Sequence, residues 1–126
     1  MYTYRKGARN ERELIHLFED EGYSIVRAAG SGVNSVSPDI LVFKKGKQYA
    51  IECKAWNSDR IAIDHEKFAA LNRWEENTGI TTMIAWKMPY GGWFFAYLPE
   101  LDVNEKSYSI TKKKMAGINR RMEELL

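Results

Sequence analysis

The chain has 126 residues, of which 44% are hydrophobic and 13% aromatic. This length and composition predict a single folded domain, residues 1–126, and exclude a disordered chain. The net charge is only +2, so the overall charge gives little indication of an acidic partner such as nucleic acid. The single cysteine excludes a disulfide framework, and with the charged N-terminus and short apolar runs we expect a cytoplasmic protein with no membrane association.

The first half of the chain predicts a basic N-terminal arm, one helix and three strands. Gly22 is typical of a residue that ends a helix, and the glycine of "KKGK" is typical of a tight hairpin turn. A stretch rich in glycine and serine, residues 30–38, predicts a loop before the hairpin. The expected elements are the arm at 1–7, a helix at 8–21, and strands at 23–29, 39–43 and 48–56.

The second half predicts two helices and one further hairpin. We expect a connection at 57–63, a helix at 64–77, strands at 81–87 and 93–98, and a helix at 111–126. The last helix would place Met115, Ile118, Met122 and Leu125 on one stripe. The order of the elements predicts one α/β domain, in which α-helices flank a central mixed five-stranded sheet.

Three ionisable residues interrupt the apolar strands of the first hairpin. Glu52 and Lys54 are two residues apart, so they project from the same face of their strand. A two-residue turn at 45–46 would place Asp39 directly opposite Glu52, with Cβ atoms ~4.5–5.5 Å apart. Two carboxylates at that distance repel each other unless a divalent cation such as Mg²⁺ lies between them. A solvated hairpin face with an ion pair from Lys54 is the alternative explanation.

A third acid lies on the first predicted helix. Leu14, Ile15 and Phe18 define the apolar stripe of this helix, and Glu11 projects into its middle. An acid on an apolar face requires a partner or a metal ion. The alternative is a glutamate at the rim, stabilised by the positive end of the helix dipole. Together with the hairpin, Glu11 gives the three carboxylates and the lysine of a Mg²⁺-dependent phosphodiesterase.

Phosphate groups have candidate partners near these acids. Ser31 lies between two glycines, where the backbone and the hydroxyl group could approach a phosphate. Basic residues that could follow a nucleic-acid backbone towards the metal site are Arg5, Lys6, Arg9, Arg12 and Arg27. A second basic group is interpreted as a solvated face of the last helix, and consists of Lys112, Lys113, Lys114, Arg120 and Arg121.

The segments "YRKGARNERELIHLFEDEGYSIVRAAGSG", "PDILV" and "IECK" resemble the archaeal Holliday junction resolvases, members of the restriction-endonuclease-like nuclease superfamily. The resemblance extends from Tyr4 to Trp56. It implies a homodimer that nicks two opposed strands of a four-way junction. It further implies that the metal ligands are Glu11, Asp39 and Glu52, that the catalytic lysine is Lys54, that Ser31 is the catalytic-loop serine, and that Arg5, Lys6, Arg12 and Arg27 contact DNA.

We therefore expect a Mg²⁺-dependent, structure-selective DNA endonuclease, with Mn²⁺ as a substitute metal, that acts on four-way junctions alongside other recombination proteins. A restriction- or repair-type nuclease of the same fold and a nucleic-acid-binding module without catalytic activity are the alternatives. The second half of the chain also carries many aromatic residues, namely Trp74, Trp86, Trp93, Phe94 and Phe95. Because strand 93–98 has aromatic residues on both faces, we expect a homodimer to cover the surplus apolar surface.

Overall fold

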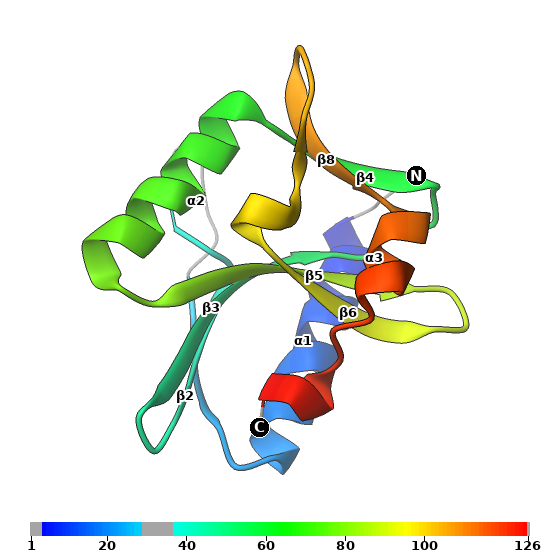
Figure 1. Ribbon diagram of the computed structural model, residues 1–126. Coiled ribbons are helices and arrows are strands. Elements are labelled where there is room, and N and C mark those ends of the chain that lie inside the picture. The colour runs from blue at the N-terminus through cyan, green and yellow to red at the C-terminus, as the bar shows by residue number, and fades with distance from the viewer. Residues whose placement is uncertain (1–3, 29–36, 126) are drawn as a thin grey trace.

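The computed structural model describes residues 4–28 and 37–125, with side chains from residue 9 onward. Its main sheet has five strands in the order β1-β2-β3-β5-β6 (Figure 1). The strands are β1 (Ser24–Arg27), β2 (Ile40–Lys44), β3 (Lys47–Lys54), β5 (Thr81–Met88) and β6 (Gly92–Tyr97). Neighbouring strands are antiparallel except β3 and β5, which are parallel. The prediction of a mixed five-stranded sheet is confirmed.

The α-helices in the described part of the chain are α1 (Tyr4–Asp20), α2 (His65–Thr78) and α3 (Lys112–Ile118). None of these helices is long and apolar enough to cross a membrane. Helix α1 includes residues 4–7, so the prediction of an arm at 1–7 is wrong for those positions, while residues 1–3 lie outside the described residues. The prediction treated Gly7 as the boundary of the arm, but a glycine inside a helix costs only about 1 kcal/mol, and arginine and lysine are good helix formers.

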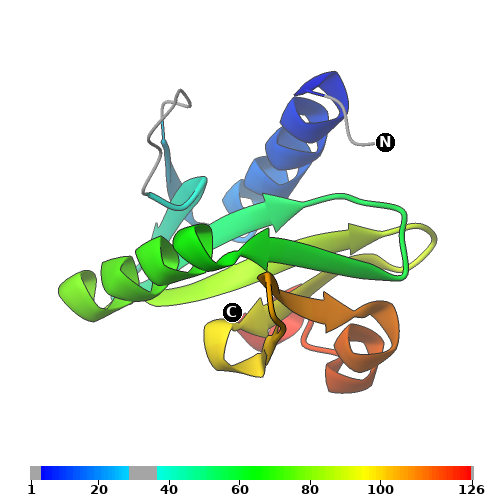
Figure 2. The ribbon, with the colours of Figure 1, turned by 90° about the horizontal axis from the view of Figure 1, so that it is seen from above.

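The main sheet is covered on both faces (Figure 2). On one face Leu14 and Phe18 of α1 pack against the sheet residues Ile51 and Met83. The other face is covered by α2, by α3 and by a second sheet of three strands in the order β4-β8-β7. Its strands are β4 (Arg60–Asp64), β7 (Asp102–Val103) and β8 (Ser107–Thr111). The sequence prediction missed this small sheet and assigned its strands to connections.

Strand β6 buries its aromatic residues on both faces within the single chain. Trp93 and Phe95 lie on the face covered by α1, and Phe94 lies on the face covered by the small sheet and α3. Their exposed fractions are 6%, 0% and 7%. The surplus aromatic surface that we expected a homodimer to cover is therefore absent at this strand, and that reason for a dimer is wrong.

The C-terminal segment is not one helix from 111 to 126. Helix α3 ends at Asn119, whose left-handed backbone (φ 50°) caps it, and a 3₁₀ helix η2 (Met122–Leu125) follows. Met115 is buried on the face of the small sheet, whereas Leu125 is buried on the face of α1. The chain passes from one face of the sheet to the other at its β6 edge, and a straight helix cannot follow that path.

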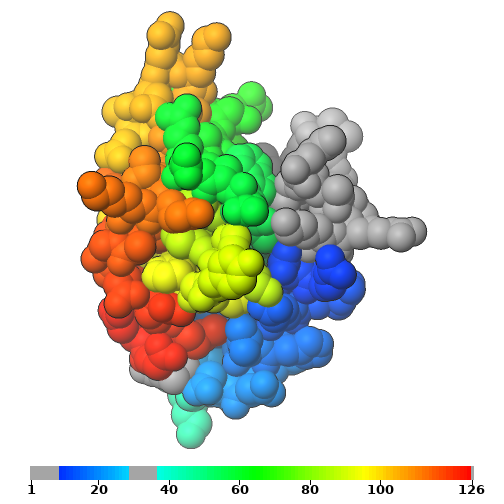
Figure 3. All heavy atoms as spheres, turned by 90° about the vertical axis from the view of Figure 1, so that its right-hand side faces the viewer, coloured from blue at the N-terminus to red at the C-terminus, as the bar shows by residue number. Residues whose placement is uncertain are grey.

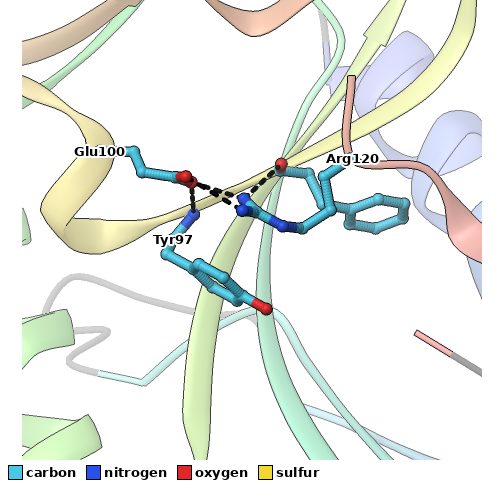
Figure 4. A network of polar contacts seen from close by, with 4 residues as sticks. Tyr97, Glu100 and Arg120 are labelled. Atoms are coloured by element: carbon cyan, nitrogen blue, oxygen red, sulfur yellow. Dashed lines mark hydrogen bonds and ion pairs between the residues drawn. The ribbon is translucent and has the colours of Figure 1, made fainter. Parts of the chain in front are cut away.

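Two arginines fasten this crossing segment to the sheet. The guanidinium group of Arg120 donates to both carboxylate oxygens of Glu100 and to the carbonyl oxygen of Phe95, and Glu100 also accepts from the backbone N–H of Tyr97 (Figure 4). Burial opposes the charge on Glu100, but the hydrogen bonds from Arg120 and Tyr97 outweigh it and lower the pKa of this carboxyl group. The interpretation of Arg120 as part of a solvated helix face is wrong.

The rest of that basic group has mixed surroundings. Arg121 donates to the carbonyl oxygens of Gly91 and Trp93, at 2.6 and 3.0 Å, so it is also a structural residue. Lys114 forms an exposed ion pair with Asp102 at 2.9 Å. Lys113 is exposed on α3, as the sequence interpretation expected.

Candidate active site

The first hairpin has the register that places its acids side by side. Its turn is the pair Lys45 and Gly46, with φ of 44° and 89°, as a two-residue type I′ hairpin turn requires. The pairing of Lys44 with Lys47 and of Ile40 with Ile51 is the predicted one. Continued by one residue, this register sets Asp39 opposite Glu52. Asp39 is fixed at the head of β2 because its Oδ2 atom accepts a hydrogen bond from the backbone N–H of Cys53, at 2.8 Å.

Glu52 is a buried acid in the middle of the main sheet. The residue is 6% exposed, and its enclosed Oε1 atom accepts no hydrogen bond of ordinary length within the described part of the chain. The ammonium group of Lys67 forms an ion pair with this oxygen at 3.5 Å. Burial, reinforced by the negative charge of Asp39, raises the pKa of Glu52 to about 7. The two carboxyl groups are close enough to repel, and a divalent cation bound between them would relieve both costs.

Lys54 projects from the same face of β3 as Glu52. Its positive charge acts to lower the pKa of Glu52, although burial and Asp39 outweigh it, so the two side chains lie close together. The Lys54 ammonium group also lies over the ring of Trp56, 5.3 Å from the ring centre. The structure thus brings Asp39, Glu52 and Lys54 together at one position on the sheet.

The third predicted acid, Glu11 on α1, is held by another residue. Its side chain is 16% exposed, and its Oε1 atom accepts a hydrogen bond from the Nε atom of Arg27. Burial raises the pKa of the Cys53 thiol, and the charges of Asp39, Glu11 and Glu52 raise it further. Nevertheless, the described residues contain no group of three or more His, Cys, Asp or Glu side chains arranged to hold a metal ion. The role of Glu11 as a metal ligand stays a prediction.

Lys67 is a site residue that the sequence reasoning missed. It lies in the first turn of α2, where its backbone N–H donates to the capping side chain of Asp64. From there its ammonium group reaches both Glu52 and the carbonyl oxygen of Ser37, the latter at 3.3 Å. The only signal in the sequence was a lysine in the first turn of a helix, where the helix dipole disfavours a positive charge.

Glu13 of α1 also makes specific contacts that were not predicted from the sequence. It accepts hydrogen bonds from the ammonium group of Lys87, at 2.7 Å, and from the indole N–H of Trp93, at 2.9 Å. Burial opposes its charge, but these hydrogen bonds outweigh burial and lower the pKa of Glu13. Glu13 therefore ties α1 to strands β5 and β6 beside the candidate site.

The predicted DNA-binding residues have different surroundings. Arg9 and Arg12 are exposed on α1, and Arg27 is half-exposed beside Glu11. The backbone of Arg5 and Lys6 belongs to α1, while their side chains are outside the described part. Ser31 lies outside the described residues. The DNA contacts of these residues stay predictions.

Glu52 and Lys54 on the central strand β3, with Asp39 beside them at the head of β2 in a mixed sheet that is covered on both faces, are typical of the class of restriction-endonuclease-like nucleases. Solved structures agree with this class. The structure of Hjc, a Holliday junction resolvase from Archaeoglobus fulgidus, superposes with a TM-score of 0.86 and 25% identity over 94% of this chain and 98% of that one. A bacterial homing endonuclease shares the fold more distantly, with a TM-score of 0.54 and 12% identity over 89% of this chain and 78% of that one.

Sequence comparison defines the family. The sequence model of the archaeal Holliday junction resolvase (hjc) family matches residues 2–126, and the chain belongs to that family. The crossover junction endodeoxyribonuclease Hjc of Methanocaldococcus jannaschii is 34% identical over 113 residues, which are 89% of this chain and 80% of the relative. The enzyme of the same name from Archaeoglobus fulgidus is 29% identical over 106 residues, 83% of this chain and 78% of the relative. The resemblance stated from the sequence is confirmed.

Proposed function

We propose that this chain is a single nuclease domain that resolves four-way DNA junctions by Mg²⁺-dependent hydrolysis of one phosphodiester bond in each of two opposed strands. One observation carries the proposal. In a member of the Hjc family, a buried carboxylate, Glu52, lies beside a second carboxylate, Asp39, on a strand face that also carries Lys54. The charge repulsion within this pair is a cost to folding that binding of a divalent cation would offset.

The donor set fits a hard cation. Asp39 and Glu52 offer carboxylate oxygens, which Mg²⁺ and Mn²⁺ prefer, and one of these oxygens is buried with only a distant ammonium group as partner. These two residues would hold the ion, and Glu11 would join them on release from Arg27. When bound, the ion supplies Lewis-acid activation of the phosphate and a lower pKa for its water.

The chain's own residues supply positioning and charge. The backbone N–H of Cys53 holds Asp39 in one orientation. Lys54 would orient the attacking water and offset the negative charge that develops on the phosphate. Arg27, once separated from Glu11, would contact a neighbouring phosphate, since a guanidinium group matches phosphate geometry. Arg9 and Arg12, which are exposed on α1, would contact phosphates of the DNA backbone further from the cleaved bond.

A homodimer is part of the proposal. One active site cuts one strand, so two cuts in opposed strands require two sites, and a two-fold dimer matches the symmetry of a four-way junction. The support is this symmetry and not the aromatic residues of β6, which are buried within one chain. Sedimentation of the protein alone at micromolar concentration tests the assembly, and a monomer there would mean that DNA itself brings two copies together.

The decisive experiment is incubation of the protein with a labelled four-way junction, with and without Mg²⁺, beside a linear duplex of the same sequence. We expect symmetric nicks in the junction only with the metal and little cleavage of the duplex. Equal cleavage of both substrates would favour a restriction- or repair-type nuclease. Metal-independent binding with no cleavage would identify a binding module.

A further inference from the structure

A pocket lies immediately beyond the candidate active site. Its volume is about 180 Å³, and its walls are formed by Asn10 of α1, by residues 55–57 after β3, and by residues 87–89 at the end of β5. Because β3 and β5 are parallel, their carboxyl ends meet at the same edge of the sheet. The pocket therefore lies at the end of the strand that carries Glu52 and Lys54.

One contact and one adjacency in the sequence connect the pocket to the candidate catalytic residues. Trp56 forms part of its wall, and the ammonium group of Lys54 lies over the Trp56 ring at 5.3 Å from the centre. Asn10, which also lines the pocket, is the neighbour of Glu11 in the chain. A phosphate group bound at Lys54 would thus bring the adjoining nucleotide to the mouth of the pocket.

The lining combines apolar walls with an unused amide group. Trp56, Met88 and Pro89 offer apolar surface, and Lys87 in the wall is neutralised by Glu13. Asn10 is 9% exposed, yet its side chain forms no hydrogen bond with any residue in the described part of the chain. The Asn10 amide carries donors and an acceptor that match the edge of a nucleobase.

The hairpin beside the pocket displays a fully exposed aromatic residue. Tyr90 directly follows Pro89, has a left-handed backbone (φ 63°), and buries none of its side chain against the protein. The hairpin is held from behind by Arg121, which donates to Gly91 and Trp93 and lies over the Phe94 ring at 4.1 Å. In Figure 3 its tip (yellow-green) stands between the segment after β3 (green) and α1 (blue). A rigid support, a strained backbone and an exposed ring are typical of a functional surface.

We infer that this pocket takes one unstacked nucleobase from the DNA strand next to the scissile phosphate, with the Asn10 amide on the edge of the base and Tyr90 as an aromatic platform beside it. The inference rests on the proposed junction cleavage, because bases at a branch point are more easily unstacked than bases within a duplex. Pockets for drug-sized ligands measure ~300–1,000 Å³, so a smaller pocket suits a single planar base. The neighbouring Lys54 favours a ligand that carries phosphate.

The test pairs protein variants with an abasic nucleotide. Binding is measured without divalent metal, so that no strand is cut, on four-way junctions in which each nucleotide flanking the branch point is made abasic in turn. For the wild-type protein we expect one position at which removal of the base weakens binding roughly tenfold. Asn10→Ala and Tyr90→Ala should weaken binding to the intact junction to a similar extent and show no further weakening on that abasic junction.

Matched variants separate this role from folding. Tyr90→Phe keeps the ring and should bind like the wild type, and Val103→Ala removes an exposed apolar side chain from the small sheet and should leave both affinities unchanged. Thermal melting should be the same for the Tyr90 variants, because the side chain packs against nothing. The inference is overturned if no abasic position weakens binding by the wild-type protein. It is also overturned if removal of the base weakens binding by both alanine variants as much as it weakens binding by the wild type. Failure of the wild type to nick junctions with Mg²⁺ would instead contradict the proposed function.

Discussion

The ammonium group of Lys67 lies 3.5 Å from the buried Oε1 atom of Glu52, and the two residues come from different layers of the fold. Glu52 belongs to the central strand β3, and Lys67 to helix α2, which covers one face of the sheet. In the protein without metal, Lys67 and Lys54 provide the positive charge that acts against the repulsion between Glu52 and Asp39. The acid pair and its two lysines are therefore one electrostatic unit, and each residue can be tested separately.

Removal of either acid should abolish catalysis and preserve binding. We expect Asp39→Asn and Glu52→Gln to cut a four-way junction at less than about 1% of the wild-type rate, because each removes an oxygen ligand from the metal. Junction affinity without metal should change little. Gel-shift and cleavage assays on the same junction check this, with Asp102→Asn on the small sheet as the control acid. A variant of Asp39 or Glu52 that retains more than a few per cent of the rate would contradict the assignment.

The metal-free protein should lose stability as pH rises through neutrality. The pKa of Glu52 is raised from 4.5 to about 7 by burial and by Asp39, so the folded state holds this proton more tightly than the unfolded chain. This difference contributes about 2–3 kcal/mol to the free energy of unfolding. The contribution is fully present below the pKa that Glu52 has in the unfolded chain, and it is lost as the pH rises through the pKa that Glu52 has in the folded protein. Urea unfolding with a chelator, at about pH 5 and about pH 8, measures the loss.

Glu52→Gln is the matched variant for this titration. Glutamine keeps the shape of the side chain but does not ionise. The difference in unfolding free energy between about pH 5 and about pH 8 should therefore be smaller in the variant than in the wild type, by most of the about 2–3 kcal/mol. An equal pH dependence in the wild type and the variant would show that Glu52 is ionised in the folded metal-free protein without cost.

Replacement of Lys67 should destabilise the metal-free protein at high pH and much less at low pH. Lys67→Met removes a charge that stabilises ionised Glu52, and we expect a loss of about 1 kcal/mol at about pH 8 but little at about pH 5, where Glu52 is protonated. Lys67→Arg should retain most of the stability. Lys114→Met is the control, because its ion pair with Asp102 is exposed and contributes little. The same loss at both pH values would assign Lys67 a packing role instead.

Arg5 and Lys6 should contact phosphate from the first turn of α1. Replacement of both by alanine should weaken binding similarly for junctions of different sequence. It should also lower the slope of log K against log salt by ~0.9 for each phosphate that the variant no longer neutralises. Lys113→Ala on α3 should leave the slope unchanged. Titrations at several salt concentrations give the slope directly, and an unchanged slope in the double variant would exclude phosphate contacts by these residues.

The Arg120 and Glu100 pair should be a measurable source of stability. Both side chains are largely buried, with 16% and 25% exposed, so Arg120→Met should lower the free energy of unfolding by about 1–3 kcal/mol. Because the pKa of Glu100 is lowered in the folded state, its contribution should be present above the unfolded pKa and lost as pH falls through the folded pKa. A double-mutant cycle with Glu100→Gln measures the coupling, and additive effects would show that the pair does not interact.

Much of the main sheet and its acid pair followed from local sequence signals. The alternation of side chains along a strand and the glycine of the "KKGK" turn were sufficient to predict the register that sets Asp39 opposite Glu52. The helix predicted at 64–77 likewise matches α2, which ends at Gly79 with a φ of 74°. Such signals act within a few residues of the chain, so they are readable without knowledge of the tertiary structure.

The remaining features depend on contacts between distant segments. The strands of the small sheet are short, from two to five residues, and only β4 alternates buried and less buried residues, so the signal in the sequence is too brief to read in a single segment. Lys67 and Glu13 gain their roles from partners that the fold brings to them, and Lys87 is 74 residues from Glu13 in the chain. The apolar stripe from Met115 to Leu125 suggested one helix, whereas those residues face opposite sides of the sheet.

The two-residue turn at Lys45 and Gly46 also restricts how the length of this protein can change during evolution. Along β3, buried apolar residues alternate with the acid and the lysine, so Ile51 and Cys53 face α1 while Glu52 and Lys54 face away. Insertion or deletion of one residue in the turn or the strand would exchange these faces and press two charges against Leu14 and Phe18. Such a chain would fail to fold before its activity could be impaired. Length changes in this hairpin should therefore survive only as pairs of residues, or where a β-bulge absorbs the extra one.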